Sequence, residues 1–168
     1  MSPAGAYRVR PATAADAAAI CIIYNQGIED RIATLETELR TPEERRQWLT
    51  TRSARHPVIV AENERGEIVG WASLNVFNPR EAYRFVADIS VYVERGYRGK
   101  GVGGVLLPRL DELARQHGFH KLVLAAFPFN PGGMALYEKQ GYRTVGIYHE
   151  QGQLDDRWVD TIVMEKLL

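Results

Sequence analysis

The sequence has little cysteine and no excess of charge of either sign. Its 168 residues contain one cysteine, Cys21, so no disulfide can form within the chain, and the cysteine content gives no indication of an oxidising compartment. Lys and Arg together number 21, as do Asp and Glu, so the formal net charge is zero. Nucleic-acid-binding proteins normally carry a basic surface that neutralises phosphates, so this balance argues against a nucleic-acid partner.

Long apolar runs are also missing. No stretch approaches the ~20 residues needed to cross a bilayer, and the N-terminus has no apolar segment of signal-peptide length. There is no internal repeat, low-complexity segment or linker, and 45% hydrophobic and 25% charged residues are ordinary values for a globular protein. We therefore expect one cytoplasmic domain over residues 1–168, without membrane association.

Hydrophobic periodicity predicts eleven elements in the order β-α-α-β-β-β-α-β-α-β-β. The expected ranges are a strand over 7–10, helices over 17–28 and from 42, strands over 58–61, 68–74 and 85–93, a helix over 101–117, a strand over 121–126, a helix over 132–140, and strands over 144–150 and 158–166. The central β-α-β crossover requires a parallel pair of strands, and the hairpins require antiparallel pairs. The predicted fold is therefore α+β, a mixed sheet with helices on both faces.

Two helix starts carry capping signals. Thr13 and Asp16 have the spacing of a capping box before the first helix. Thr41 offers an N-cap that is followed by proline at the first helical position. Cys21 falls on the apolar face of the first helix, which favours packing over a nucleophilic role.

The most informative stretch is a glycine-rich loop between a predicted strand and a predicted helix. Five of the nine residues from Gly96 to Gly104 are glycine, and glycine lets the backbone approach a ligand closely. The first turn of a helix has unpaired N–H groups and a partial positive charge, which suit a phosphate. Arg98 and Lys100 add cationic donors. A solvated flexible turn is the alternative, and the placement between strand and helix disfavours it.

Two nucleotide-binding motifs fit this loop poorly. Gly99-x-Gly101-x-x-Gly104 formally matches the dinucleotide fingerprint, which expects an acidic residue about 20 positions later, at the end of the next strand. Residues 119–124 contain no carboxylate. The Gly-Lys-Ser/Thr sequence of a P-loop is missing as well.

The loop resembles that of the GNAT acetyltransferases. Arg98-x-x-Gly101-x-Gly103 matches the Q/R-x-x-G-x-G/A loop with which this family holds the pyrophosphate of acetyl-CoA. The resemblance covers nearly the whole chain and is greatest to the phosphinothricin and methionine sulfoximine N-acetyltransferases. It includes the stretches Arg8-x-Arg10-x-Ala12-Thr13-x-x-Asp16, Ile23-Tyr24-Asn25, Ser90-Val91-Tyr92-Val93, Leu136-Tyr137-Glu138-x-x-Gly141-Tyr142 and Arg157-Trp158-x-Asp160.

This resemblance implies a fold, a co-substrate and a set of cofactor contacts. It implies the GNAT fold, with a mostly antiparallel sheet whose central parallel pair splays, acetyl-CoA without a metal, a small-molecule amine as partner, and a homodimer. The implied cofactor-binding residues are Val91, Tyr92, Val93, Arg98, Gly99, Lys100, Gly101, Val102, Gly103, Gly104 and Asn130. Asn130 has a second interpretation, since asparagine is also a favoured helix N-cap, and both can hold.

The implied catalytic residues are Asp88 and Tyr137. Alkyl ammonium groups have a pKa near 10, so a base helps the amine to attack at neutral pH. Asp88 aligns with a glutamate given this role in the phosphinothricin branch, and its shorter side chain favours a bridging water. Tyr137 matches the GNAT general-acid tyrosine, although this branch often has histidine there. The alternatives are a solvent-facing carboxylate for Asp88 and core packing for Tyr137.

Substrate contacts rest on the same resemblance. Arg80, Tyr83 and Arg84 lie in the segment that corresponds to the branch's acceptor-binding loop, where an arginine fork would suit a carboxylate or phosphinate. Glu29 and Leu35 fall where the branch places other pocket residues. Asn78 and Val86 depart from the branch, which commonly has a basic residue and a threonine there.

Three functions are therefore open. The first is N-acetylation of an amino-acid analogue, and the second is N-acetylation of another amine, such as a polyamine, an aminoglycoside or a protein N-terminus. The third is a non-catalytic acyl-CoA sensor. The presence of both Asp88 and Tyr137 favours an enzyme.

Overall fold

The computed structural model describes residues 6–168, and residues 1–5 of the predicted domain lie outside the described part. Within it, the order of helices and strands matches the predicted order. The strands are β1 (Arg8–Pro11), β2 (Val58–Glu62), β3 (Ile68–Val76), β4 (Val86–Val93), β5 (Lys121–Ala126), β6 (Arg143–Leu154) and β7 (Arg157–Leu167). The helices are α1 (Ala17–Glu29), α2 (Pro42–Thr50), α3 (Val102–Gln116) and α4 (Pro131–Lys139), with short 3₁₀ turns at η2 (Ala14–Asp16), η3 (Glu81–Tyr83) and η4 (Arg95–Tyr97).

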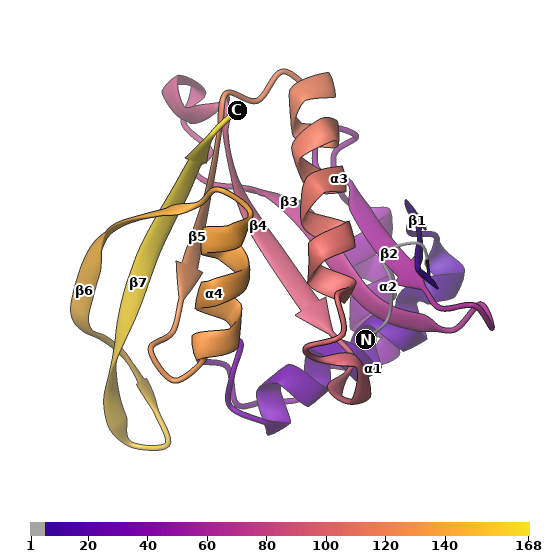
Figure 1. Cartoon of the computed structure of the whole chain (residues 1–168), viewed down its shortest axis with the longest axis horizontal. Helices are drawn as coiled ribbons and strands as arrows, with labels where there is room; N and C mark the ends of the chain where they lie inside the picture. Colours follow the sequence, from indigo (N-terminus) through magenta and orange to yellow (C-terminus); the bar gives the residue numbers. More distant parts are fainter. Residues whose placement is uncertain (1–5) are drawn as a thin grey trace.

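The described strands form one seven-stranded sheet in the order β1-β2-β3-β4-β5-β7-β6. Neighbouring strands are antiparallel except β4 and β5, which are parallel and joined through α3. Helix α3 covers one face of the sheet, and α1 and α2 lie on the other face (Figure 1). The predicted α+β fold, a mixed sheet with helices on both faces, is confirmed.

The parallel pair is joined over a short distance only. Strand β4 pairs with β5 from Val86 to Asp88, opposite Lys121 to Val123. Beyond Asp88, β4 continues to Val93 and β5 to Ala126 without pairing to each other. Figure 1 shows the two strands diverging below this point, with α4 in front of the gap. The backbone edge of β4 from residue 89 to 93 therefore has no strand partner on the β5 side.

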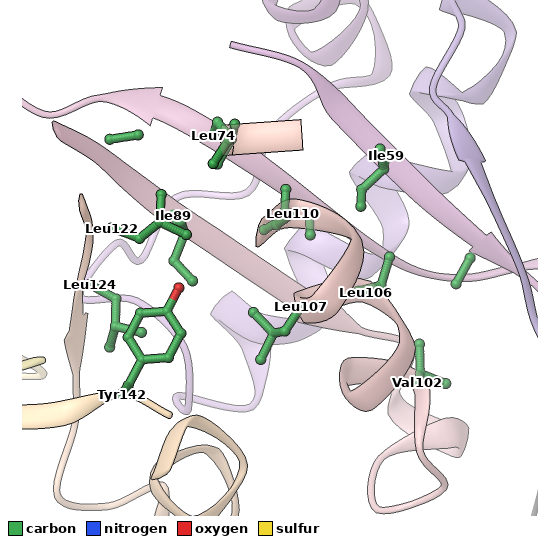
Figure 2. Close-up of a cluster of buried hydrophobic side chains, with 14 of the residues drawn as sticks. Ile59, Leu74, Ile89, Val102, Leu106, Leu107, Leu110, Leu122, Leu124 and Tyr142 are labelled. Atoms are coloured by element: carbon green, nitrogen blue, oxygen red, sulfur yellow. The ribbon is translucent and has the colours of Figure 1, made fainter. Parts of the chain in front are cut away.

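Two hydrophobic cores hold the helices on the sheet. Leu106, Leu107 and Leu110 of α3 are almost completely buried against Leu74, Ile89 and other side chains of the sheet (Figure 2). On the other face, α1 buries Ile20, Ile23, Tyr24 and Ile28 against Val58, Val60 and Trp71. Burial of a large aliphatic side chain contributes about 1.5–3 kcal/mol, so both faces are firmly anchored.

The capping residues predicted from the sequence lie where they were expected at most helix ends. Thr41 accepts a hydrogen bond from the Glu44 N–H, and Gly118 adopts a φ of +80° after α3. The predicted Thr13–Asp16 capping box is present, and it begins the 3₁₀ turn η2 that precedes α1. There Asp16 accepts from the Thr13 N–H at 2.7 Å and forms an ion pair with Arg10. Cys21 is buried, as its packing role required.

Pro108 lies within α3, where its missing N–H removes one backbone hydrogen bond.

Among the helices of residues 6–168, none is both long enough and apolar enough to cross a membrane.

Candidate active site

The glycine loop leads into α3 at the open end of the β4–β5 gap. Its glycines occupy their positions for different physical reasons. Gly99 and Gly101 have φ angles of +75° and +88°, which side chains rarely tolerate. At Gly103 a Cβ atom would lie 2.5 Å from Leu136 Cδ2 of α4, so a larger residue there would displace that side chain. Gly104 meets no atom within 4 Å of such a Cβ and faces open space. The loop therefore presents the first N–H groups of α3 without side chains in front of them.

The two cations of the loop are already engaged. The Arg98 guanidinium donates to Asp30 at 2.6 Å, and Arg95 holds the same carboxylate at 2.8 Å. These arginines keep the pKa of Asp30 below its ordinary value, with Arg95 the larger influence. Lys100 extends over the Tyr97 ring at 5.5 Å from its centroid. The sequence indicated that Arg98 and Lys100 add cationic donors, and in the structure Arg98 is paired with Asp30.

A cavity of about 250 Å³ runs along the gap and reaches the glycine loop. Ten of the eleven predicted cofactor-binding residues line it, and Lys100 does not. The ring of Tyr92, one of these residues, stacks on Trp71 at 4.8 Å between centroids. Gly27 makes room for that ring, because a Cβ at Gly27 would lie 2.9 Å from Tyr92 Cε2. Strand β4 therefore packs closely against α1, while its edge on the β5 side stays open.

A second cavity of about 200 Å³ lies toward the point where the strands join. Asp88 and Tyr137 both line it, from β4 and α4. The two cavities share the lining residues Ile32, Ala33, Val91, Tyr92, Asn130, Gly133 and Tyr137. They therefore form one continuous cleft that leads from the glycine loop to Asp88.

Asp88 is the last residue of β4 that pairs with β5, so it lies at the closed end of the cleft. Burial raises the pKa of its carboxyl to about 6, and a hydrogen bond from Asn75 partly opposes that rise. Half-buried at this position, Asp88 is not the solvent-facing carboxylate of the alternative interpretation. A carboxylate with this pKa is largely ionised at pH 7 and is a stronger base than an exposed aspartate.

Tyr137 meets the same cleft from α4. Burial raises its pKa to about 12, and the negative charge of Asp88 adds to the rise. Its phenol is therefore protonated at neutral pH and can donate a proton or a hydrogen bond. Its ring also packs edge-on against Tyr142 at 6.0 Å, so the packing role is fulfilled too.

Asn130 caps α4 and also connects it to the other side of the cleft. Its Oδ1 accepts from the Gly133 N–H at 3.1 Å, which confirms the N-cap interpretation. Its Nδ2 donates to the Ile32 carbonyl at 3.2 Å. A single side chain thereby fixes the segment after α1 to the start of α4.

The predicted substrate-binding residues are not gathered at the cleft. Arg80, Tyr83 and Arg84 lie before β4, at the opposite end of this strand from the gap, and line neither cavity. Arg84 bonds within its own turn, to the Glu81 carbonyl. Glu29 is exposed beside Arg95, and Leu35 packs against Gly152 of β6.

Other residues of the cleft were missed by the sequence analysis. Thr34 and Phe127 line the inner cavity, and Asn75 lies opposite Asp88 on β3. The strand pattern could have suggested Asn75 only if the register of the β3–β4 hairpin had been known. Among residues 6–168 there is no group of three or more His, Cys, Asp or Glu side chains placed to hold a metal ion.

Comparison with known proteins agrees with this geometry. A family model described as the Acetyltransferase (GNAT) family matches residues 24–142, and the chain belongs to this family. The predicted superfamily, fold and enzyme class, an N-acetyltransferase, are thereby confirmed.

Named relatives cover almost the whole chain. The L-methionine sulfoximine/L-methionine sulfone acetyltransferase of Pseudomonas aeruginosa is 34% identical over 158 residues, which are 94% of this chain and 92% of the relative. A phosphinothricin acetyltransferase from Sinorhizobium meliloti, solved in complex with AcCoA, has a TM-score of 0.91 and 31% identity, covering 97% of this chain and 89% of that one. The ribosomal-protein-alanine N-acetyltransferase from Brucella melitensis has a TM-score of 0.91 and 39% identity, covering 96% and 99%.

The burial of Asp88 predicts a pH-dependent gain in stability on its removal. Asp88→Asn should raise the free energy of unfolding at pH 7 by about 1–3 kcal/mol, because the folded protein then no longer buries an ionised carboxylate without a cation. Its folded pKa of about 6 exceeds the ordinary 3.8. The native Asp88 is therefore penalised as pH rises through this interval, and the two proteins should converge near pH 4.

Urea denaturation at both pH values measures this difference. Asp156→Asn, in the exposed β6–β7 turn, is the matched control and should show no such trend. If Asp88→Asn and the native protein have the same free energy of unfolding at both pH values, Asp88 is not desolvated.

Proposed function

We propose that residues 1–168 act as one acetyl-CoA-dependent N-acetyltransferase domain, in which the thioester lies beside Asp88 at the closed end of the cleft and its acetyl group passes to the amine. The observation that carries this proposal is the loss of β4–β5 pairing directly after Asp88. It leaves a row of backbone groups along residues 89–93 that can hydrogen-bond the amide-containing pantetheine arm. The relative crystallised with AcCoA supports the same co-substrate.

The glycine loop would hold the pyrophosphate. Val102, Gly103 and Gly104, which carry the first N–H groups of α3, line the larger cavity, and a helix N-terminus favours an anion. Arg98 would contribute mainly by tying the loop to Asp30, so that backbone donors supply most of the binding. No metal is needed in this scheme.

Asp88 would act as the general base. The acceptor nitrogen attacks the thioester carbonyl, a C–N bond forms, and the nitrogen loses a proton to the Asp88 carboxylate directly or through water. Collapse of the tetrahedral intermediate breaks the C–S bond. Tyr137, protonated at neutral pH, would give a proton or a hydrogen bond to the departing CoA thiolate. The two side chains line one cavity from β4 and α4, as this division of roles requires.

The acceptor that we propose is an amino-acid analogue such as methionine sulfone, methionine sulfoximine or phosphinothricin. Several relatives at 29–34% identity bear these names. Arg80 and Arg84 remain the candidate ligands of an acceptor carboxylate, although in this structure they lie outside the cleft. The Brucella relative favours a second candidate, a protein N-terminal amine.

A homodimer is part of the proposal. The β6–β7 hairpin carries the exposed apolar side chains Val145, Ile147, Tyr148 and Trp158, the last 61% exposed, and such a group suits a symmetric contact. We also propose a cytoplasmic location, where acetyl-CoA is available.

Release of CoA from acetyl-CoA tests the reaction and its acceptor together. The panel should contain methionine sulfone, methionine sulfoximine, phosphinothricin, common amino acids, a polyamine, an aminoglycoside and a peptide that begins with alanine. We expect amine-dependent release of CoA with the amino-acid analogues to be fastest. Turnover of the peptide alone would favour the second candidate, and tight binding of CoA without turnover of any amine would leave the sensor interpretation.

Substitution of the two catalytic candidates should separate their roles. Asp88→Asn should lower kcat/KM at pH 7 by roughly ten- to ten-thousandfold, with a smaller loss at higher pH, where neutral amine is abundant. In the native protein, kcat/KM should fall below about pH 6 as Asp88 takes up its proton. Tyr137→Phe should lower kcat with little change in the Kd of acetyl-CoA. Full activity in either variant at pH 7 would remove that residue from the mechanism.

A further inference from the structure

A polar side chain, Asn75 on β3, lies beside Asp88. The antiparallel register places Asn75 directly opposite Asp88, and Ser73 directly opposite Ser90. Asn75 Nδ2 donates to Ser90 Oγ at 3.1 Å, and the Asn75 amide acts on the Asp88 carboxyl as a donor that lowers its pKa. The polar side chains of these two strands therefore form one connected group on the α1–α2 face of the sheet.

The orientation of the Asn75 amide is fixed by its other neighbours. Asn75 Oδ1 accepts from Arg52 Nη2 at 2.9 Å and from Ser73 Oγ at 3.0 Å. An arginine side chain has only donors, so the amide atom that faces Arg52 must be the oxygen. The NH₂ group is then the end that faces Ser90 and Asp88.

Arg52, which follows α2, is held in place with no carboxylate partner among residues 6–168. Its Nε donates to the His56 carbonyl at 3.0 Å, and its Nη2 also donates to the Leu74 carbonyl. The guanidinium stacks on Trp48 at 4.4 Å from the ring centroid. Burial lowers the pKa of Arg52 to about 10, so it stays cationic at neutral pH. With no carboxylate to neutralise it, its polar interactions are directed at main-chain carbonyls and at Asn75.

We propose that Arg52 is a positioning residue for the acetyl-transfer reaction, which it serves by fixing the Asn75 amide with its NH₂ group toward Asp88. This role rests on the proposed function only in so far as Asp88 is the base. Nothing in the fold of β3 alone would select that orientation, because an amide flipped by 180° fits the same space with its oxygen toward Asp88.

The orientation decides the ionisation of the base. An NH₂ group stabilises the carboxylate form of Asp88, whereas a carbonyl oxygen in its place would repel that form. Among residues 6–168, the groups whose pKa is raised by burial and also by the Asp88 charge are Tyr137 and Tyr142, so their hydroxyls are neutral at pH 7. The side chain across from Asp88 on β5 is the apolar Val123. Arg52, acting through Asn75, is thus the means by which the protein keeps Asp88 largely ionised at pH 7.

Direct titration of Asp88 by carboxyl ¹³C NMR tests this proposal without any need for activity. The Asp88 resonance is assigned by its loss in Asp88→Asn. Asn75→Ala should raise the pKa of Asp88 by about one unit, the equivalent of one hydrogen bond to the charged form. Arg52→Met should raise it as well, because the Asn75 amide is then free to turn.

The double variant distinguishes positioning from a direct charge effect. If Arg52 acts only through Asn75, then Arg52→Met in the Asn75→Ala background should leave the Asp88 pKa where Asn75→Ala alone puts it. Arg45→Met is the matched control, because Arg45 also stacks on Trp48, at 4.6 Å, and it has no bond to Asn75. It removes the same charge and should leave Asp88 unchanged.

Two results would overturn the proposal: an unchanged Asp88 pKa in Arg52→Met, or a further rise in the double variant. A measurement on the native protein tests the proposal without depending on the folding of any Arg52 variant. The chemical shifts of its Asn75 side-chain amide protons should change with pH at the same midpoint as the Asp88 titration. Amide shifts that do not change at this midpoint would also overturn the proposal.

The kinetic consequence separates this proposal from the proposed function. The acid limb of the kcat/KM profile should move to higher pH in Arg52→Met and Asn75→Ala, in step with the NMR titration. If the NMR titration behaves as expected and the kinetic limb does not follow, Asp88 is not the base, and the orienting contact of Arg52 stands on its own.

Discussion

Pairing between β4 and β5 stops after three residue pairs, and the functional geometry of the molecule depends on where it stops. Parallel neighbours normally share hydrogen bonds along their whole length, so the unpaired edge of β4 is a run of backbone groups that need another partner. The sheet can accept this because both strands are held from their other sides, β4 by β3 and β5 by β7. The gap is thus a stable feature of the fold that a linear, amide-containing ligand can fill.

Packing around the gap maintains its shape. The Tyr92 ring contacts both Trp71 and Tyr24, and Gly27 makes room for that ring. Gly103 lets α3 and α4 approach closely at the open end, and Asn130 ties α4 to the segment after α1. At the closed end, the half-buried Asp88 carboxylate lowers stability and has raised basicity, a combination that is common at sites selected for chemistry.

The sequence was most informative where the signal is local. The glycine loop, the start of α2 at Thr41 and the β2–β3 hairpin each combine a periodic pattern with turn or cap residues, and each lies where it was expected. The cofactor-binding stretch is contiguous, so a short motif was enough to locate it.

Contacts between segments that are distant in the chain could not be predicted from local sequence patterns. The Asp30–Arg98 ion pair joins residues 68 positions apart, and the contact between Asn75 and Asp88 depends on the exact register of a hairpin with a long connection. The acceptor loop was placed by resemblance, and Arg80 and Arg84 prove to lie beyond the closed end of the gap. Side-chain amides such as Asn75 carry no sequence signal of their own, because their role is set by neighbours on other strands.

Amide hydrogen exchange along β4 tests most directly whether the gap is the acetyl-CoA site. Residue-resolved exchange measured by NMR should show that the amides of residues 89–93 that face β5 exchange readily in the free protein. They should become protected at saturating CoA, while the amides of β2, already paired on both sides, should not change. If CoA binds and the exchange of residues 89–93 stays the same, the cofactor lies elsewhere and the account is wrong.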